Sequence, residues 1–380
     1  MIAIIGGGIG GLTTALAFEK LGVPYKLFEK AKIIDAVGAG IWLPPNALQV
    51  FDWINPKLLT KIKQTGNELN RILVADHNLK PISDLDQVFV KKQFGYSTIA
   101  IHRGKLQQIL YEFVNKENIK LGKEFQKYVT SKKETVDITF TNENSFSAKC
   151  LVGADGIHSK VRKQLFPKSK IRYSGQTCWR GISNYDIGTS LKYTGATLWG
   201  ERLQFGVSKI SKDKVYWFAV KLSKPNLKDT SEDLKQDLIQ LFNGFHPIVH
   251  NLINHTSKNK IIRTDLNDLE LLKKWYKGNI CLIGDAAHSM TPDLGQGGAQ
   301  AIEDAFYLTQ AISNSKKEED AFVDFHKSRK TKVEKLVKLS RQTSKMAVLK
   351  YGSSFRNFAL KNMPEKYTQK QMLNIYTLKK

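Results

Sequence analysis

Residues 2–29 read IAIIGGGIGGLTTALAFEKLGVPYKLFE, and this stretch determines the fold that the sequence predicts. Its first four residues form an apolar run typical of a buried parallel strand. A glycine-rich turn follows, then a helical stretch from about residue 10 to residue 21, and then a second apolar strand that ends in Glu29. A strand, a turn, a helix and a second strand in this order predict an α/β fold that begins with a dinucleotide-binding unit.

The turn matches the pattern G-x-G-x-x-G, with Gly6, Gly8 and Gly11 at its fixed positions. Gly6 permits the tight turn, Gly8 lets the backbone approach a pyrophosphate, and Gly11 lets the helix pack closely on the strand. Glu29 comes about 20 residues later, where a carboxylate can accept hydrogen bonds from ribose hydroxyls. We assign Glu29 and the adjacent Lys30 to the same cofactor site. These features indicate a dinucleotide without distinguishing NAD from FAD.

A second glycine-rich stretch, ICLIGDAAHSMTPDLGQGG at residues 280–298, favours FAD. It reads as an apolar strand, a Gly-Asp turn and the start of a long helix. A flavin needs such a second segment because its ribityl chain and isoalloxazine ring extend well beyond the pyrophosphate. A carboxylate can accept hydrogen bonds from the ribityl hydroxyls, and a helix N-terminus can stabilise the ring edge that becomes negative on reduction. The candidate cofactor residues here are Gly284, Asp285, Pro292, Gly295, Gly297 and Gly298.

These motifs resemble those of the single-component (class A) FAD-dependent aromatic hydroxylases, the family typified by para-hydroxybenzoate hydroxylase. Between the two glycine-rich stretches lies CLVGADGIHSKVR at residues 150–162, which is similar to a motif that the family uses for both FAD and the nicotinamide cofactor. Residues 38–48 and 102–110 resemble family segments beside the flavin. The resemblance implies further cofactor residues, namely Gly40, Arg103, Asp155 and Arg162. It is closest in appearance to the branch of salicylate and urate hydroxylases and zeaxanthin epoxidase.

The resemblance implies a Rossmann-like FAD-binding domain of the GR2 type, an inserted mixed β-sheet substrate domain and a C-terminal helix. Short alternating stretches between residues 174 and 221 agree with an inserted sheet. The expected FAD-binding domain comprises residues 1–75, 100–172 and 273–330, the substrate domain comprises residues 76–99 and 173–272, and the C-terminal helical segment comprises residues 331–380.

Two features of the inserted stretches bear on the substrate. Five aromatic residues either form a flat apolar slot against the flavin or simply pack in a core; they are Trp179, Trp199, Phe205, Trp217 and Phe218. Arg202 and Tyr216 fall near an arginine and a tyrosine of the substrate pocket in the urate hydroxylase branch. The resemblance therefore implies a catalytic role for both, in which Arg202 stabilises a substrate anion and Tyr216 hydrogen-bonds it.

The activity implied by the resemblance is that of a FAD-dependent monooxygenase that consumes NADPH or NADH. It would insert one oxygen atom from O2 into a small aromatic or alkene substrate through a flavin 4a-hydroperoxide. FAD is expected to bind non-covalently, and the nicotinamide cofactor only transiently, because the sequence has no second Rossmann fingerprint. Three alternatives stay open: a reductase or halogenase-like flavoenzyme of the same fold, an NAD dehydrogenase, and a non-enzymatic module that binds through its basic surface.

The charge of the chain at first suggests a nucleic-acid or membrane partner. Its formal net charge is +24 in 380 residues. However, 49 of the basic residues are Lys and 10 are Arg, and they are dispersed along the chain. Dispersed Lys is typical of a solvated surface, whereas nucleic-acid sites favour Arg. We therefore expect no nucleic-acid partner, and only residues 327–350 form a basic helical surface that could touch anionic lipid.

Cysteine and histidine spacing indicates the setting of the protein. Cys150, Cys178 and Cys281 are odd in number and lack CxxC spacing, and the eight His lack HxH and HExxH spacing. This pattern predicts no disulfide framework and no metal, and it favours a cytoplasmic protein. No stretch of about 20 apolar residues predicts a membrane span, and we expect a monomer or homodimer.

Overall fold

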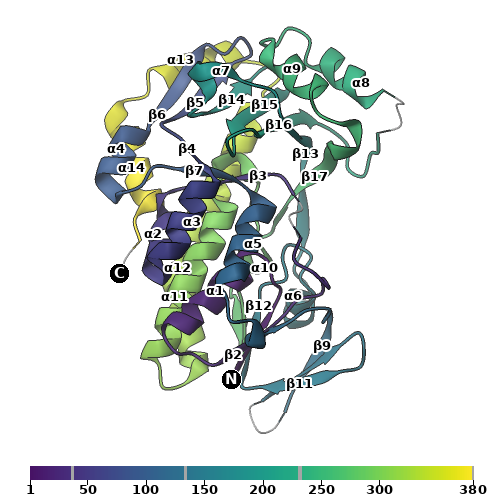
Figure 1. Ribbon diagram of the computed structural model, residues 1–380, viewed down its shortest axis with the longest axis vertical. Helices are drawn as coiled ribbons and strands as arrows, with labels where there is room; N and C mark the ends of the chain where they lie inside the picture. The colour runs from purple at the N-terminus through teal and green to yellow at the C-terminus, as the bar shows by residue number, and fades with distance from the viewer. Residues whose placement is uncertain (36–37, 132–134, 230–232, 379–380) are drawn as a thin grey trace.

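Residues 1–35, 38–131, 135–229 and 233–378 are described by a computed structural model. The molecule is elongated, with a parallel sheet and its helices at one end and a larger sheet at the other (Figure 1). The described strands form four sheets, two large and two small. One small sheet joins β3 (Gly40–Leu43), β7 (Ile99–His102) and β4 (Asn67–Glu68), and the other joins β9 (Phe125–Thr130), β10 (Val136–Phe140) and β11 (Ser145–Ala148).

The first large sheet is the predicted Rossmann-like sheet. Its strand order is β18-β19-β12-β1-β2-β8, and every neighbouring pair is parallel except β18 with β19. The strands are β1 (Ile2–Ile5), β2 (Tyr25–Phe28), β8 (Ile119–Lys120), β12 (Cys150–Gly153), β18 (Tyr276–Lys277) and β19 (Ile280–Leu282). The chain first proceeds from β1 to β2 on one side and later returns to β12 on the other. The crevice beside the carboxyl end of β1 is therefore a topological switch point, where such sheets bind ligands.

Helices cover this sheet and continue its strands. In chain order they are α1 (Ile9–Lys20), α2 (Pro45–Ile54), α3 (Pro56–Thr65), α5 (Arg103–Phe113), α6 (Lys160–Leu165), α10 (Asp285–His288) and α11 (Gly297–Asn314), with short 3-10 turns η1 (Lys116–Asn118) and η3 (Pro292–Leu294). Helix α1 ends where Gly22 adopts a φ of +68°, which favours glycine. Its neighbour in space is α11, although nearly 300 residues separate them in the sequence (Figure 1).

The second large sheet is the mixed sheet that the resemblance implied. Its order is β17-β13-β16-β15-β14-β5-β6, and β14 with β5 is its parallel pair. The strands are β5 (Arg71–Asp76), β6 (Pro81–Asp86), β13 (Ile171–Ser183), β14 (Thr194–Trp199), β15 (Leu203–Lys209), β16 (Val215–Leu222) and β17 (Ile262–Leu269). The boundaries expected after residues 75 and 330 fall inside β5 and the long helix α12, so we propose to move them to the ends of these elements.

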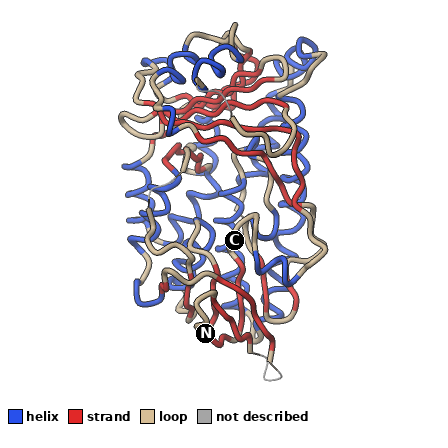
Figure 2. Tube along the Cα trace, turned by 90° about the vertical axis from the view of Figure 1, so that its right-hand side faces the viewer, coloured by secondary structure: helices blue, strands red, loops and turns tan. Residues whose placement is uncertain are grey.

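Helices pack on both faces of this sheet (Figure 2). The outer face carries α7 (Gly188–Leu191), α8 (Leu234–Leu241) and α9 (Ile248–Asn254), the last followed by η2 (Lys258–Lys260). Three of the five aromatic residues proposed for a slot against the flavin instead form this outer core, namely Trp179, Phe205 and Trp217. Trp199 is buried next to Arg356. Phe218 alone of the five lines the inner cavity, because successive strand residues point to opposite faces.

The C-terminal part of the chain crosses both layers. The long helix α12 (Glu318–Ala347) is followed by α13 (Ser353–Lys361) and α14 (Glu365–Tyr376). Helix α4 (Gln87–Phe94) packs near α14. The basic stretch 327–350 thus belongs largely to α12, where Arg329 and Arg341 form internal ion pairs. Among the described residues, no helix is both long and apolar enough to cross a bilayer.

Candidate active site

A cavity of about 520 Å³ lies between the two layers. The strands β13 to β16 line it from one side, and β3 and the segment from Asp285 to Gly298 line it from the other. Sequence-predicted residues at its wall are Gly40, Arg103, Tyr216, Asp285, Pro292, Gly295, Gly297 and Gly298. Segments that are far apart in the sequence therefore meet at one space, as the resemblance implied.

The turn after β1 requires glycine at two of its predicted positions. Gly6 has a φ of +109°, and a Cβ there would lie 2.4 Å from the carbonyl oxygen of Ala154. A Cβ at Gly11 would lie 1.9 Å from the carbonyl oxygen of Gly6, so glycine lets α1 start this close to β1. At Gly8 a Cβ would meet nothing within 4 Å. The open space at Gly8 adjoins the N-terminus of α1, where backbone amides can bind phosphate.

Glu29 fixes the same turn from the end of β2. Its carboxylate accepts hydrogen bonds from the backbone amides of Gly7 at 2.5 Å and Ala31 at 2.9 Å. Gln107 on α5 donates to the carbonyl oxygen of Gly7 at 2.8 Å. Lys30 is exposed beside it. Gln107 was not predicted, although it stands one helical turn after Arg103 in a segment that resembles the family.

Helix α5 connects the glycine-rich turn with the cavity. Arg103, its first residue, lines the cavity, and its backbone amide donates to Ala39 at 2.8 Å. Gln107 contacts the turn one helical turn later, which is a rise of about 5.4 Å. The turn and the cavity are therefore adjacent along one helix. This arrangement suits two ends of one elongated ligand better than two separate ligands.

The middle motif lies between the two glycine-rich segments. Asp155 accepts a hydrogen bond from the backbone amide of Val161 at 3.2 Å, while its Oδ1 is buried without a partner. Burial raises the pKa of this carboxyl group. Arg162 is 1% exposed and donates to the carbonyl oxygens of Ile157 at 2.5 Å and Ala286 at 3.1 Å. Arg162 therefore links the middle motif to the Gly-Asp turn, which is a positioning role.

Asp304 on α11 holds the Gly-Asp turn in place. Gly284 has a φ of +56°, and its amide donates to Asp304 Oδ2 at 2.9 Å. His288 Nε2 lies 2.6 Å from the same oxygen. Arg329 Nε donates to the other oxygen, Oδ1, at 2.8 Å. Burial alone would raise the pKa of Asp304, but His288 and Arg329 outweigh it and lower the value to about 2.

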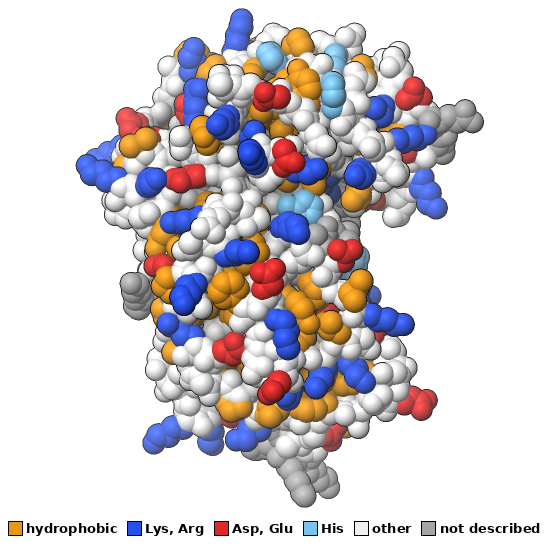
Figure 3. Space-filling view, viewed as in Figure 1, with side chains coloured by type: hydrophobic (Ala, Val, Ile, Leu, Met, Phe, Trp, Pro, Cys, Tyr) orange, Lys and Arg blue, Asp and Glu red, His pale blue; other side chains and the backbone are white. Residues whose placement is uncertain are grey.

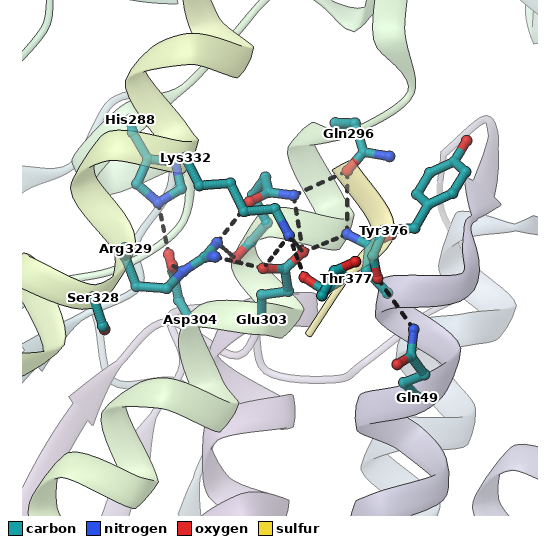
Figure 4. A network of polar contacts seen from close by, with 12 residues as sticks. Gln49, His288, Gln296, Glu303, Asp304, Ser328, Arg329, Lys332, Tyr376 and Thr377 are labelled. Atoms are coloured by element: carbon teal, nitrogen blue, oxygen red, sulfur yellow. Dashed lines mark hydrogen bonds and ion pairs between the residues drawn. The ribbon is translucent and has the colours of Figure 1, made fainter. Parts of the chain in front are cut away.

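Asp304 belongs to a buried polar network along α11 and α12 (Figure 4). Glu303 pairs with Arg329 and with Lys332, the latter at 2.9 Å. Asn46 on α2 donates to Glu303 at 2.5 Å and to Gln296 at 3.2 Å. Gln296 immediately precedes α11, so the network fixes the helix N-terminus that faces the cavity. Sequence reasoning missed this network because Asn46 lies 250 residues before Gln296 and 257 before Glu303.

The opposite wall carries a charged and a phenolic side chain. Tyr216 on β16 packs over Gly40, where a Cβ would lie 2.4 Å from its ring. Arg180 on β13 hydrogen-bonds the Tyr216 side chain and donates to Thr264 Oγ1 at 2.5 Å. Burial raises the pKa of Tyr216, and the positive charge of Arg180 opposes that rise. Tyr216 is therefore a neutral phenol at ordinary pH, and Arg180 holds it in the cavity.

Arg202, which the resemblance implied as a substrate contact, does not line the cavity. It lies exposed in the turn between β14 and β15, with a φ of +57°, and it is absent from the cavity wall. Its backbone amide donates to Leu349 at 3.2 Å. On the side of the mixed sheet, the arginine that lines the cavity is therefore Arg180. Strand alternation around Cys178 and Phe218 could have indicated Arg180, since all three share one face.

Asp293 is a further cavity residue that the sequence did not single out. It lies between Pro292 and Gly295, and its Oδ2 is buried without a hydrogen-bond partner. Burial raises the pKa of Asp293 to about 6, against hydrogen bonds from Thr291 and Ser344 that lower it. A carboxyl group with a pKa near the working pH is suited to proton transfer.

The residues fit FAD at both ends of the site. Gly8 leaves room for a pyrophosphate, Asp155 carries an orphan carboxylate oxygen, and Asp285 is exposed at the cavity wall. Gly298 lets α11 approach β3 closely, because a Cβ would lie 2.8 Å from Ile41 Cδ1. The ring of a flavin would then meet the N-terminal amides of α11.

Comparison with known proteins places the chain in a family. A family model described as FAD binding domain matches residues 1–340, and the chain belongs to the FAD-dependent class A monooxygenases. It is 36% identical over 312 residues to the aurachin C monooxygenase/isomerase of Stigmatella aurantiaca, covering 82% of this chain and 80% of that protein. This membership confirms FAD as cofactor and excludes the NAD dehydrogenase and the non-enzymatic module.

Two further relatives show how far the similarity extends. A zeaxanthin epoxidase of an Oncidium hybrid cultivar is 31% identical over 368 residues, which are 91% of this chain and 55% of that protein, so the chain spans about half of it. The structure of Klebsiella pneumoniae HpxO complexed with FAD and uric acid superposes with a TM-score of 0.91 and is 25% identical, covering 99% of this chain and 96% of that one. The predicted fold class is confirmed.

Asp285→Ala is expected to weaken FAD binding by about tenfold to 100-fold, because a hydrogen bond to a charged group contributes about 1.5–3 kcal/mol. The dissociation constant can be measured by titrating apoprotein with FAD and following flavin fluorescence. Asp84→Ala, an exposed carboxylate on β6 outside the cavity, is the matched control. Equal affinities for both variants and the wild type would remove Asp285 from the site.

Proposed function

We propose that the protein is a monooxygenase that consumes NADPH or NADH and transfers one oxygen atom from O2 to a small aromatic or alkene substrate. The observation that carries this proposal is the shared cavity, in which flavin-side elements face side chains of the mixed sheet. Asp285 and the start of α11 lie on one wall, and Arg180 and Tyr216 lie on the other. A substrate held by the second pair would lie against a flavin held by the first.

The cavity wall indicates the chemistry of the substrate. Apolar side chains line much of it, including Phe218, Val220 and Met290. Arg180 and Tyr216 supply hydrogen-bond donors at one place in this apolar surface. We therefore propose a flat, largely apolar substrate that carries one hydroxyl or carbonyl oxygen. Three relatives support oxygen transfer to unsaturated molecules: a monooxygenase/isomerase of aurachin C, an epoxidase of zeaxanthin and a hydroxylase of urate.

The roles of the residues follow from their positions. FAD, once bound and reduced, supplies the activated oxygen. The N-terminal amides of α11 would stabilise negative charge on a flavin ring bound beside them. Arg180 stabilises negative charge on a substrate oxygen, and Tyr216 donates a hydrogen bond to it. Asp293, when ionised, accepts the proton that the substrate loses.

A second cavity of about 700 Å³ adjoins the first and supports a nicotinamide reductant. The two cavities share Gly38, Ala39, Arg180 and Ile262. The second is lined by basic side chains that include Lys105, Lys214 and Lys260. Such a wall attracts the phosphates of NADPH or NADH without a second Rossmann fingerprint.

The test is to purify the protein with FAD and measure NADPH and NADH oxidation under O2 with phenols, quinolones, urate and isoprenoid alkenes. We expect one compound to accelerate oxidation and to yield a product heavier by one oxygen atom. Flavin reduction under anaerobic conditions at two ionic strengths tests the reductant separately, since phosphate binding at the second cavity weakens with salt. A product without added oxygen would support the alternative, a reductase or halogenase-like flavoenzyme.

The pH dependence of turnover tests Asp293. Because its pKa is about 6, we expect kcat/KM to fall about tenfold per pH unit below that value as the base is protonated. Asp293→Asn should abolish this acid limb and lower the plateau by about 100-fold. The raised pKa also means that the folded state binds the proton more tightly, so this group's contribution to stability declines as pH rises through the value. An unchanged limb in the variant would assign it elsewhere.

A further inference from the structure

Helix α13 (Ser353–Lys361) exposes an aromatic face. Phe355 and Phe358 are 76% and 67% exposed, and Tyr351, just before the helix, is 73% exposed. Phe355 and Phe358 are three residues apart, which places their side chains on one side of the helix. A helix on the surface of a globular protein normally turns its apolar side chains inward. Helix α13 does the reverse.

A buried arginine fixes this orientation. Arg356 is 6% exposed, and it donates to the carbonyl oxygen of Met346 at 2.8 Å. Its guanidinium lies 5.0 Å from the centre of the Trp199 ring. The polar side of α13 is therefore the side that contacts the protein, and rolling the helix to bury Phe355 would expose these contacts.

Exposed basic residues precede and follow the aromatic residues in the sequence, and Figure 3 shows Lys and Arg side chains interspersed with hydrophobic ones at this end of the molecule. Lys350, Lys361, Lys366 and Lys370 are exposed, and Lys350 Nζ lies 4.3 Å from the centre of the Tyr351 ring. Between residues 345 and 370, Glu365 is the sole acidic residue. The segment thus combines exposed aromatic rings with positive charge, the combination that binds a membrane interface.

We propose that the surface formed by Tyr351, Phe355, Phe358 and the flanking lysines docks the protein reversibly on an anionic lipid bilayer. The rings would enter the boundary between headgroups and acyl chains, and the lysines would contact acidic headgroups. A bilayer suits this surface better than a second copy of the chain. A stable dimer buries about 1,200–2,000 Å², whereas three side chains on a helix of 9 residues form a small convex patch.

The test is sedimentation of the FAD-loaded protein with phosphatidylcholine vesicles, with and without about 30% phosphatidylglycerol, an anionic lipid. We expect binding to the anionic vesicles alone. The double variant Phe355→Ser with Phe358→Ser should reduce bound protein by about tenfold. Val129→Ser, which removes a side chain 58% exposed on β9, is the matched control and should bind as the wild type does. Unchanged flavin content and circular dichroism show that the variants fold.

Several outcomes would overturn the proposal. One is a wild-type protein that stays in the supernatant with anionic vesicles. Another is binding that Lys350→Glu with Lys361→Glu abolishes but the double serine variant leaves unchanged, which would indicate unspecific adsorption of charge. A third is a concentration-dependent dimer in sedimentation velocity that the double serine variant converts to monomer, which would assign the face to self-association.

Discussion

Arg329→Met is expected to lower the free energy of unfolding by about 3–5 kcal/mol, the cost of removing one partner from a buried ion pair. Arg329 is 1% exposed, and its guanidinium contacts both Glu303 and Asp304, which are fully buried. Methionine fills a similar volume but leaves two carboxylates with fewer partners. Urea unfolding followed by circular dichroism measures this change in free energy. The variant should also bind FAD more weakly, because Asp304 accepts a hydrogen bond from Gly284 in the Gly-Asp turn of the FAD site.

Arg341→Met is the matched control for this prediction. Arg341 also lies on α12 and pairs with a buried carboxylate, that of Asp268. However, Asp268 keeps a second partner in Arg172, and Arg341 itself is 23% exposed. Its replacement should therefore cost markedly less. Similar losses for the two variants would show that the network around Arg329 has no special weight.

Acid unfolding provides a second readout of the same network. In the wild type the lowered pKa of Asp304, about 2, means that its contribution to stability is present above its unfolded value and is lost as pH falls toward 2. Without Arg329 that pKa should rise, so acid unfolding of Arg329→Met should begin at higher pH. A midpoint that does not shift between the two proteins would contradict the assignment.

Local patterns allowed prediction of the first sheet and of the long helices. The strand, turn and helix of residues 2–21 depend on glycines that act within a few residues, and Gly6 and Gly11 show the close approaches that the motif implies. The stretch at residues 280–298 likewise indicated the start of the long helix α11. The resemblance added the mixed sheet and FAD. In each case the interactions that determine the structure join residues close together in the sequence, or they belong to a motif of a known family.

The rest depends on contacts between distant segments. Asn46 and Glu303 are 257 residues apart, and nothing in either neighbourhood indicates their hydrogen bond. The mixed sheet presents a different difficulty: alternation shows that a strand has two faces but does not say which one faces the cofactor. The aromatic residues of β13 to β16 therefore divided between two sides. The resemblance suggested Arg202 for the substrate pocket, whereas the structure has it in a turn outside the cavity.

Arg180→Met is expected to reduce kcat/KM for an anionic or phenolic substrate by about 100-fold, comparable to the loss of one donor to a developing negative charge. Arg180 contacts Tyr216 within the cavity, so its removal takes away both a positive charge and the group that positions the phenol. FAD content should stay unchanged, since Asp285, Arg103 and the start of α11 are intact. Steady-state turnover and the flavin spectrum measure the two quantities separately.

Arg202→Met is the control that distinguishes the two arginines. Both substitutions remove one positive charge and keep a side chain of similar length, but Arg202 is exposed outside the cavity. We expect Arg202→Met to retain wild-type kcat/KM, because a charge in solvent is screened from the substrate. A large loss of kcat/KM for Arg202→Met together with normal turnover for Arg180→Met would assign the substrate contact to Arg202, as the resemblance implied. The turn before β15 would then have to reach the cavity during catalysis.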